Sequence, residues 1–108
     1  MDRERLEAKY LEAGLTRYRL RSVDDLLAVH GIDCRKIVGY SGLNDVNQQL
    51  FDGFIVNFMN AQGMDDRRAI IPKGVNYVQE RGARYLRFDF TKSGRNAWLH
   101  VRSGHTWD

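Results

Sequence analysis

The sequence contains one cysteine, one proline and no apolar run that approaches the roughly 20 residues of a membrane span. The single thiol, Cys34, excludes an internal disulfide and supplies only one metal ligand, so neither a disulfide framework nor a zinc module is expected. The segment MDRERLEAKY lacks the apolar centre of a signal peptide. These absences predict a soluble, cytoplasmic protein that is not cleaved and does not enter a membrane.

Recognised catalytic and metal-binding motifs are also missing. The sequence has no GxSxG, no HExxH, no CxxC and no glycine-rich phosphate loop. Asp89, His100 and His105 are metal-ligand residue types, but two histidines on either side of Gly104 are more typical of a solvated tail. We therefore expect no metal, no cofactor and no catalysis. An enzyme whose acids and histidines, such as His30, converge only in the fold stays an alternative.

Length and composition indicate one folded domain. The chain has 108 residues, of which 43% are hydrophobic and 29% charged, so apolar side chains are plentiful enough to offset the entropy of folding. A chain of this length buries roughly 60% or more of its unfolded surface, which is enough to fold without disulfides. The residues at 1–63 are predicted to be helical, and those at 70–103 to form a β-meander.

Three helices are predicted in the first part of the chain. One spans residues 2–13, one follows Ser22 and ends at Gly31, and a longer one begins near Leu43, after a cap at Ser41. Residues 32–40 are typical of either a short strand or a loop. The segment at 54–59 is predicted to continue the long helix, with a strand after a break at Asp52-Gly53 as the alternative.

The second part alternates in hydrophobicity and predicts three antiparallel strands at 74–79, 84–90 and 96–102. Placing Glu80 opposite Ala83 closes the first hairpin with a two-residue turn. Placing Thr91 opposite Asn96 closes the second through the loop at 92–95. The expected fold class is α+β, with two or three helices packed on one face of a three- to four-stranded antiparallel sheet.

This register divides the sheet into two faces of different composition. The face predicted to pack on the helices is nearly all apolar: Val75, Tyr77, Leu86, Phe88, Phe90, Ala97, Leu99 and Val101. The outer face mixes arginine with aromatic rings: Asn76, Val78, Tyr85, Arg87, Asp89, Trp98, His100 and Arg102.

Positive charge is concentrated near the C-terminus. The chain has 13 arginines and 4 lysines; residues 65–108 hold nine basic and five acidic residues, whereas residues 22–64 hold two and five. A basic side of this kind attracts phosphate backbones or acidic protein surfaces.

The outer sheet face is the main candidate for function. Aromatic rings on which bases can stack, together with guanidinium groups that bind phosphates, favour nucleic acid or a nucleoprotein complex as the partner. The expected role is that of a phage or mobile-element regulator or a stoichiometric inhibitor. The alternative is a protein-protein interaction module or homodimer in which Trp98, Tyr85 and Val78 form a buried patch. A purely structural interpretation pairs Tyr85 with Arg102 and covers Trp98 with another part of the chain. The predicted binding residues are Arg87, Trp98, His100, Arg102 and Tyr85, with Arg84, Lys92 and Arg95 adding diffuse attraction for phosphate.

The remaining polar features have structural interpretations. His30 is predicted to be a core or boundary histidine, because it lies on an apolar helical face. Cys34 is predicted to be a partly buried structural residue, although the neighbouring Arg35 and Lys36 would favour its thiolate. The run at 65–68, DDRR, is predicted to be a charged loop.

Overall fold

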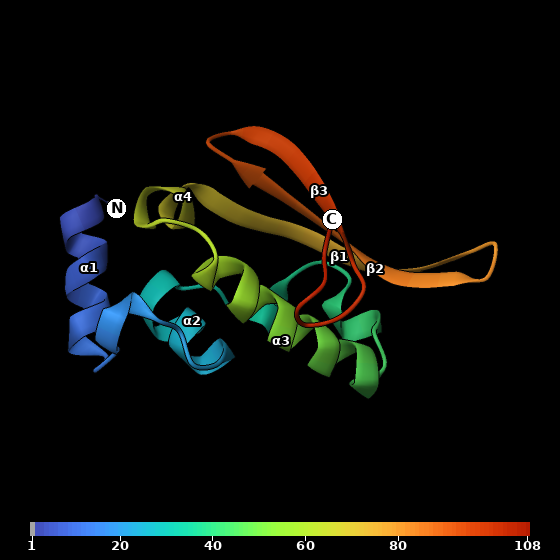
Figure 1. Ribbon diagram of the computed structural model, residues 1–108, viewed down its shortest axis with the longest axis horizontal. Coiled ribbons are helices and arrows are strands. Elements are labelled where there is room, and N and C mark those ends of the chain that lie inside the picture. Colours follow the sequence, from blue (N-terminus) through green and yellow to red (C-terminus); the bar gives the residue numbers. More distant parts are fainter. Residues whose placement is uncertain (1) are drawn as a thin grey trace.

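The computed structural model describes residues 2–108 and confirms the predicted α+β fold (Figure 1). Its helices are α1 (Arg3–Glu12), α2 (Val23–His30), α3 (Asp45–Asn60) and α4 (Met64–Ala69). Its strands are β1 (Ile70–Glu80), β2 (Ala83–Lys92) and β3 (Arg95–Val101). Helices α2 and α3 lie on one side of the sheet, and α1 lies beyond its end, next to α2 and α4 (Figure 1). No helix of the described residues is long and apolar enough to cross a membrane.

The sheet is antiparallel in the order β1-β2-β3, and both predicted registers are confirmed. Glu80 pairs with Ala83, and Thr91 pairs with Asn96. Both hairpins close with two-residue turns, Arg81-Gly82 and Ser93-Gly94, whose four φ angles are all positive, as type I′ turns require. The predicted loop at 92–95 is therefore shorter, because Lys92, the last residue of β2, pairs with Arg95, the first residue of β3.

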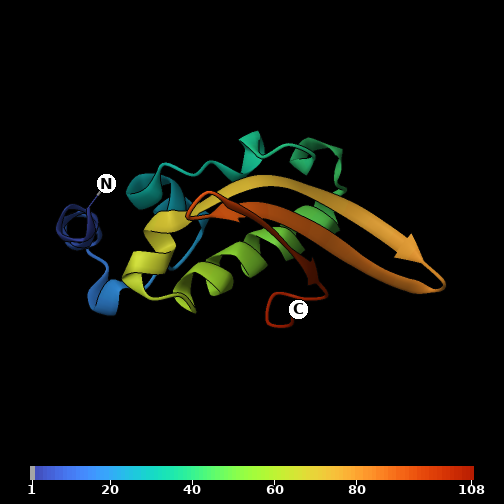
Figure 2. The ribbon, with the colours of Figure 1, turned by 90° about the horizontal axis from the view of Figure 1, so that it is seen from above.

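Strand β1 begins four residues earlier than predicted. Pro72 interrupts the hydrophobic alternation of the sequence, but the structure accommodates it because β1 is an edge strand of the sheet. Proline has no backbone N–H to donate, and an edge strand tolerates this loss. The register shifts between Pro72 and Gly74, which is a β-bulge. Beyond this bulge, β1 and β2 extend as a hairpin past the end of the helical layer (Figure 2).

The long helix α3 runs through residues 54–59, so the alternative strand is wrong. Its N-terminal cap is Asn44, whose side-chain oxygen accepts a hydrogen bond from the Asn47 N–H at 2.8 Å, and not the predicted Ser41. Ser41 lies instead in the 3-10 turn η3 (Tyr40–Gly42). The helix is amphipathic only in its first half, because its second half is buried on several sides.

The core lies between α3 and the inner sheet face and is rich in aromatic rings. Phe54 packs against Phe51, Phe58, Phe88 and Trp107, with ring centroids 5.4–5.9 Å apart. Inner-face residues of the sheet complete it, as predicted: Val75, Leu86, Phe88, Phe90 and Val101 are buried, and Ala97 and Leu99 are half-buried.

Tyr77 departs from the predicted packing. It lies on the inner face opposite Leu86, yet 44% of its surface is exposed. The physical reason is the length of the hairpin, whose turn end extends past the helical layer (Figure 2). Tyr77 belongs to this half of β1 and lines an open cleft opposite the start of α3.

The DDRR segment is not a loop, because residues 64–69 form α4. Its Arg67 is buried and donates hydrogen bonds to the Gln62 carbonyl at 2.9 Å, the Asn60 carbonyl at 3.2 Å, the Tyr10 hydroxyl at 3.0 Å and the Tyr18 carbonyl. The Asn60 carbonyl belongs to the last residue of α3 and the Gln62 carbonyl lies just beyond it, where the helix dipole favours a cation. Arg67 thereby joins α4 to the end of α3 and to the N-terminal segment.

The segment at 32–40 is mostly irregular. It contains the 3-10 turn η2 (Cys34–Lys36) and one bridge, between Val38 and Gly74, in which the Val75 N–H donates to the Val38 carbonyl at 2.9 Å. Gly39 has a φ of 91° and lies against the Val75 backbone, where a Cβ atom would overlap the carbonyl oxygen. This contact covers the first part of the open edge of β1.

Candidate binding surface on the outer sheet face

Five predicted binding residues form one continuous row on the outer sheet face, which we call the aromatic ladder. Its members alternate along β2 and β3, so the register places their side chains on the same side: Tyr85, Arg87, Trp98, His100 and Arg102. Within residues 2–108 nothing covers this row completely, because Arg87, Trp98 and Arg102 are exposed and Tyr85 and His100 are half-buried. Trp98 is 49% exposed, so the interpretation that another part of the chain covers it is wrong.

The ladder is held together by contacts between neighbouring side chains. The His100 ring lies between Trp98 and Tyr85, with centroids at 4.8 Å and 4.2 Å. Guanidinium groups lie over the other two rings. Arg87, which pairs with His100 across the strands, lies over the Trp98 ring at 4.8 Å, and Arg102 lies over the Tyr85 ring at 5.6 Å. The predicted pair of Tyr85 and Arg102 is therefore present, as one end of a longer stack.

Carboxylates neutralise both arginines of the ladder. The Arg87 guanidinium binds Asp89 on the same strand, with Nη2 and Oδ1 3.1 Å apart, and Arg102 Nε lies 3.5 Å from Asp108 Oδ1. The Asp108 N–H donates to the His100 carbonyl at 2.9 Å, which holds the C-terminal segment against β3. Asp108 was absent from the predicted site, because its approach depends on the turn after β3.

The Tyr85 hydroxyl donates a hydrogen bond to Glu80 Oε2 at 3.2 Å. Partial desolvation and the neighbouring carboxylate raise the pKa of Tyr85, so its phenol stays protonated and neutral near pH 7. The ladder thus presents aromatic rings together with two arginines that each have an aspartate partner within the molecule.

The other predicted binding residues lie away from the ladder. Arg84 and Lys92 alternate with Leu86 and Phe90 and so share the inner side of the sheet. Lys92 Nζ binds Asp66 Oδ1 at 3.2 Å, and the exposed Arg95 pairs with Lys92 across the second hairpin. These three residues border the sheet, and the structure does not bring them together with the ladder.

Ile71 is an exposed apolar residue of the same outer face that the sequence did not reveal. It pairs with Thr91, which alternates with Asp89 and Arg87, so it lies on the outer face, and it is 54% exposed. The sequence does not show that β1 begins as early as Ile70. Because Pro72 breaks the hydrophobic alternation, the sequence does not assign Ile71 to either face of the sheet.

Two buried polar clusters lie elsewhere in the molecule. In one, the Tyr40 hydroxyl donates to Asp52 at 3.0 Å and burial raises the pKa of Asp52, while burial and that carboxylate raise the pKa of the adjacent Cys34 to about 12. In the other, burial and the Arg67 charge lower the pKa of His30 to about 4. A protonated thiol and a neutral, hydrogen-bonded histidine are typical of structural residues.

The set of Asp89, His100 and His105 does not gather into a metal site. Within residues 2–108, no group of three or more histidines, cysteines and carboxylates is placed to hold a metal ion. His105 instead lies 3.3 Å from the Asn57 side chain, on the opposite side of the core from the ladder.

Comparisons with known proteins assign no family. No family model matches the chain, and no curated protein or solved structure matches it.

Proposed function

We propose that this protein is a non-catalytic binding module that recognises a protein partner through the aromatic ladder. The observation that carries the proposal is the exposed stack of Arg87, Trp98, His100, Tyr85 and Arg102. Tryptophan, tyrosine and arginine are the residues most enriched at the centres of protein interfaces. The stack also restrains these side chains before binding, which lowers the entropy that an interface must overcome.

Charge balance favours protein over nucleic acid as the partner of this face. A phosphate backbone attracts arginines that lack a counter-ion, whereas Arg87 and Arg102 already have Asp89 and Asp108 beside them. Bases stack on open ring faces, but here the His100 ring lies between Trp98 and Tyr85, and a guanidinium group lies over each of those two rings. The exposed surfaces of Trp98 and Ile71 are better suited to apolar protein contacts.

Nucleic acid or a nucleoprotein complex is a second candidate, which the cations around the sheet favour. Lys73, Arg81 and Arg95 are exposed, and none forms a salt bridge with a carboxylate of residues 2–108. They would provide phosphate contacts at the border of the ladder. A regulator or inhibitor of a nucleoprotein complex would use both features. The ladder would contact the protein of the complex, and the exposed cations around the sheet would contact its phosphates.

The test is affinity isolation of the tagged protein, without nuclease, from cells that carry its gene. The washes use about 50 mM and about 500 mM salt, because binding through several phosphates weakens by orders of magnitude over such a range. We expect a stoichiometric protein that is retained at both salt concentrations and after nuclease treatment.

Each outcome of this isolation decides between the candidates. Nucleic acid retained only at low salt would replace the protein partner with the second candidate. A second copy of the chain, seen as a dimer by sedimentation, would identify the partner as the protein itself. Retention of neither protein nor nucleic acid would contradict the proposal.

A further inference from the structure

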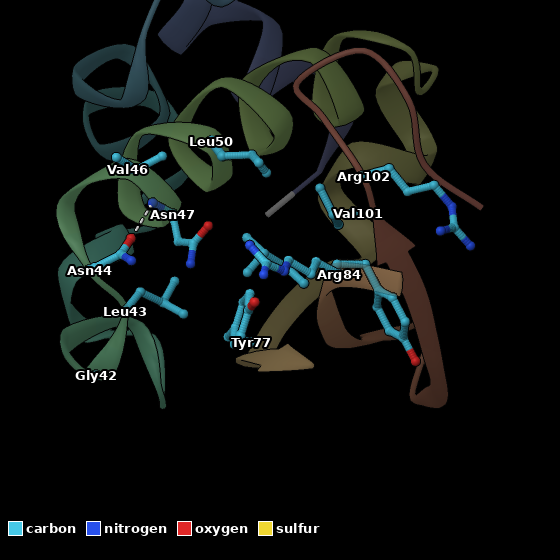
Figure 3. A pocket seen from close by; sticks show the side chains of 12 residues that line it. Gly42, Leu43, Asn44, Val46, Asn47, Leu50, Tyr77, Arg84, Val101 and Arg102 are labelled. Carbon is cyan, nitrogen blue, oxygen red and sulfur yellow. Dashed lines mark hydrogen bonds between the residues drawn. The ribbon is translucent and has the colours of Figure 1, made fainter. Parts of the chain in front are cut away.

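A cleft of about 650 Å³ opens on the inner side of the sheet, where the hairpin extends past the helical layer (Figure 3). One wall is the start of α3, with Val46 and Leu50, and the preceding Leu43. The other wall is the inner face of the sheet, with Tyr77 and Leu86. Its volume falls within the ~300–1,000 Å³ that is typical of ligand-binding sites.

Apolar side chains in this cleft are left uncovered. Val46 is 72% exposed and Tyr77 is 44% exposed, on opposite walls. Tyr77 occupies a position that the strand alternation assigns to the core. The cleft therefore extends the apolar core outward, and no helix of the described residues covers its side chains.

The cleft carries a positive charge that has no counterpart. Arg84 extends from β2 into the cleft, toward Asn47 of α3 (Figure 3). No carboxylate of residues 2–108 lines the cleft, and Arg84 forms no salt bridge with any of them. The exposed Lys73, Arg81 and Arg95 also lack a carboxylate partner, but of these unpaired cations Arg84 is the one that lines the cleft.

We infer that this cleft binds an acidic, apolar peptide segment of another protein. A carboxylate of the segment would pair with the Arg84 guanidinium, which can donate two parallel hydrogen bonds. An adjacent bulky side chain would lie between Val46 and Tyr77 and remove both from water. The exposed walls favour a peptide over a small free acid, because small-molecule sites commonly bury ~70–90% of their ligand.

The cleft and the aromatic ladder adjoin, because Tyr85 and Arg102 of the ladder also line the cleft. Arg102 points away from the cleft (Figure 3), and Trp98 does not line it. The inference rests on Arg84, Val46 and Tyr77, which are not ladder residues, so it does not depend on the proposed function of the ladder. A Trp98→Ala variant should keep its affinity for peptide.

The test is selection of a random heptapeptide display library on the immobilised protein, followed by fluorescence anisotropy with the labelled synthetic peptides. We expect the selected peptides to combine Asp or Glu with a neighbouring Leu, Phe or Trp. Arg84→Gln should weaken their binding about tenfold or more, as expected for a lost charge-assisted hydrogen bond. Arg81→Gln is the matched control, since it removes the same charge from an exposed turn outside the cleft, and it should change affinity less than about twofold.

Val46→Glu supplies a second variant that preserves the core, because Val46 is mostly exposed. It introduces a carboxylate into the cleft and should abolish measurable binding of acidic peptides. The inference is overturned if selection yields no peptides or peptides without acidic residues. Equal effects of the Arg84 and Arg81 variants, or full binding by Val46→Glu, would overturn it as well.

Discussion

The Tyr10 hydroxyl lies 2.7 Å from Nε2 of His30 and, on its other side, accepts a hydrogen bond from Arg67 Nη1 at 3.0 Å. Because the guanidinium can only donate, the hydroxyl proton is available for His30. With His30 Nε2 as its acceptor, the neutral ring carries its own proton on Nδ1. Protonation of Nε2 would break this arrangement beside a cation, which agrees with the low pKa of His30.

We expect the protein to lose stability in mild acid because of His30. Its pKa falls from 6.5 to about 4 on folding, so between these values the unfolded chain binds a proton that the folded chain does not. The free energy of unfolding should fall by up to about 3 kcal/mol as the pH drops from 6.5 to 4. Urea unfolding at several pH values measures this change, and His30→Gln should flatten it. An equally steep fall in the variant would show that other groups are responsible.

Replacement of Arg67 by methionine should destabilise the fold by about 2 kcal/mol or more, because several buried oxygens would lose their donor. Arg68→Met is the matched control. Arg68 is exposed and its distance to Asp65 is 3.9 Å, so its loss should cost less than about 0.5 kcal/mol. Chemical denaturation of both variants measures the difference, and similar midpoints would refute the structural role of Arg67.

Gly39→Ala should cost about 2 kcal/mol or more. Its positive φ disfavours any side chain, and the new Cβ would overlap the Val75 carbonyl, forcing the segment at 38–40 away from β1. Gly42→Ala is a suitable comparison, since nothing lies within 4 Å of its Cβ position. If both variants unfold at the same temperature, the close approach of Gly39 to β1 is wrong.

Cys34 should react slowly with thiol reagents at pH 8. Its side chain is 4% exposed, and burial raises its pKa to about 12, so thiolate is scarce and poorly accessible. Labelling with a disulfide reagent should be at least about a hundredfold faster in denaturant, because the unfolded thiol has an ordinary pKa of ~8.5. Rapid labelling of the native protein would instead indicate a reactive cysteine.

The sheet could be predicted in detail because local chemistry determines it. Positive φ angles at Arg81-Gly82 and Ser93-Gly94 select two-residue turns, and these turns fix which residues face each other. Alternation then assigns Trp98 and Arg87 to one face and Phe88 to the other. The composition of the ladder follows from sequence for this reason.

Features that depend on contacts between distant segments could not be predicted. Arg67 looks like part of a solvated charged loop, and its burial requires acceptors from α1, η1 (Thr16–Tyr18) and the end of α3 to meet around it. The carboxylate of Asp108 reaches Arg102 only because the C-terminal turn folds back on β3. The exposure of Tyr77 depends on where the helices end, which alternation in a strand does not encode.

The most direct measurement of the role of the ladder is quantitative recovery of the partner by Trp98→Ala and Leu11→Ala variants. Trp98 is 49% exposed and Leu11 is 63% exposed, so both variants should fold with unchanged circular dichroism. The account predicts that Trp98→Ala recovers about a tenth or less of the partner bound by wild type, as for an interface hot spot, and that Leu11→Ala recovers all of it. Undiminished recovery by Trp98→Ala would contradict the assignment of binding to the outer face of the sheet.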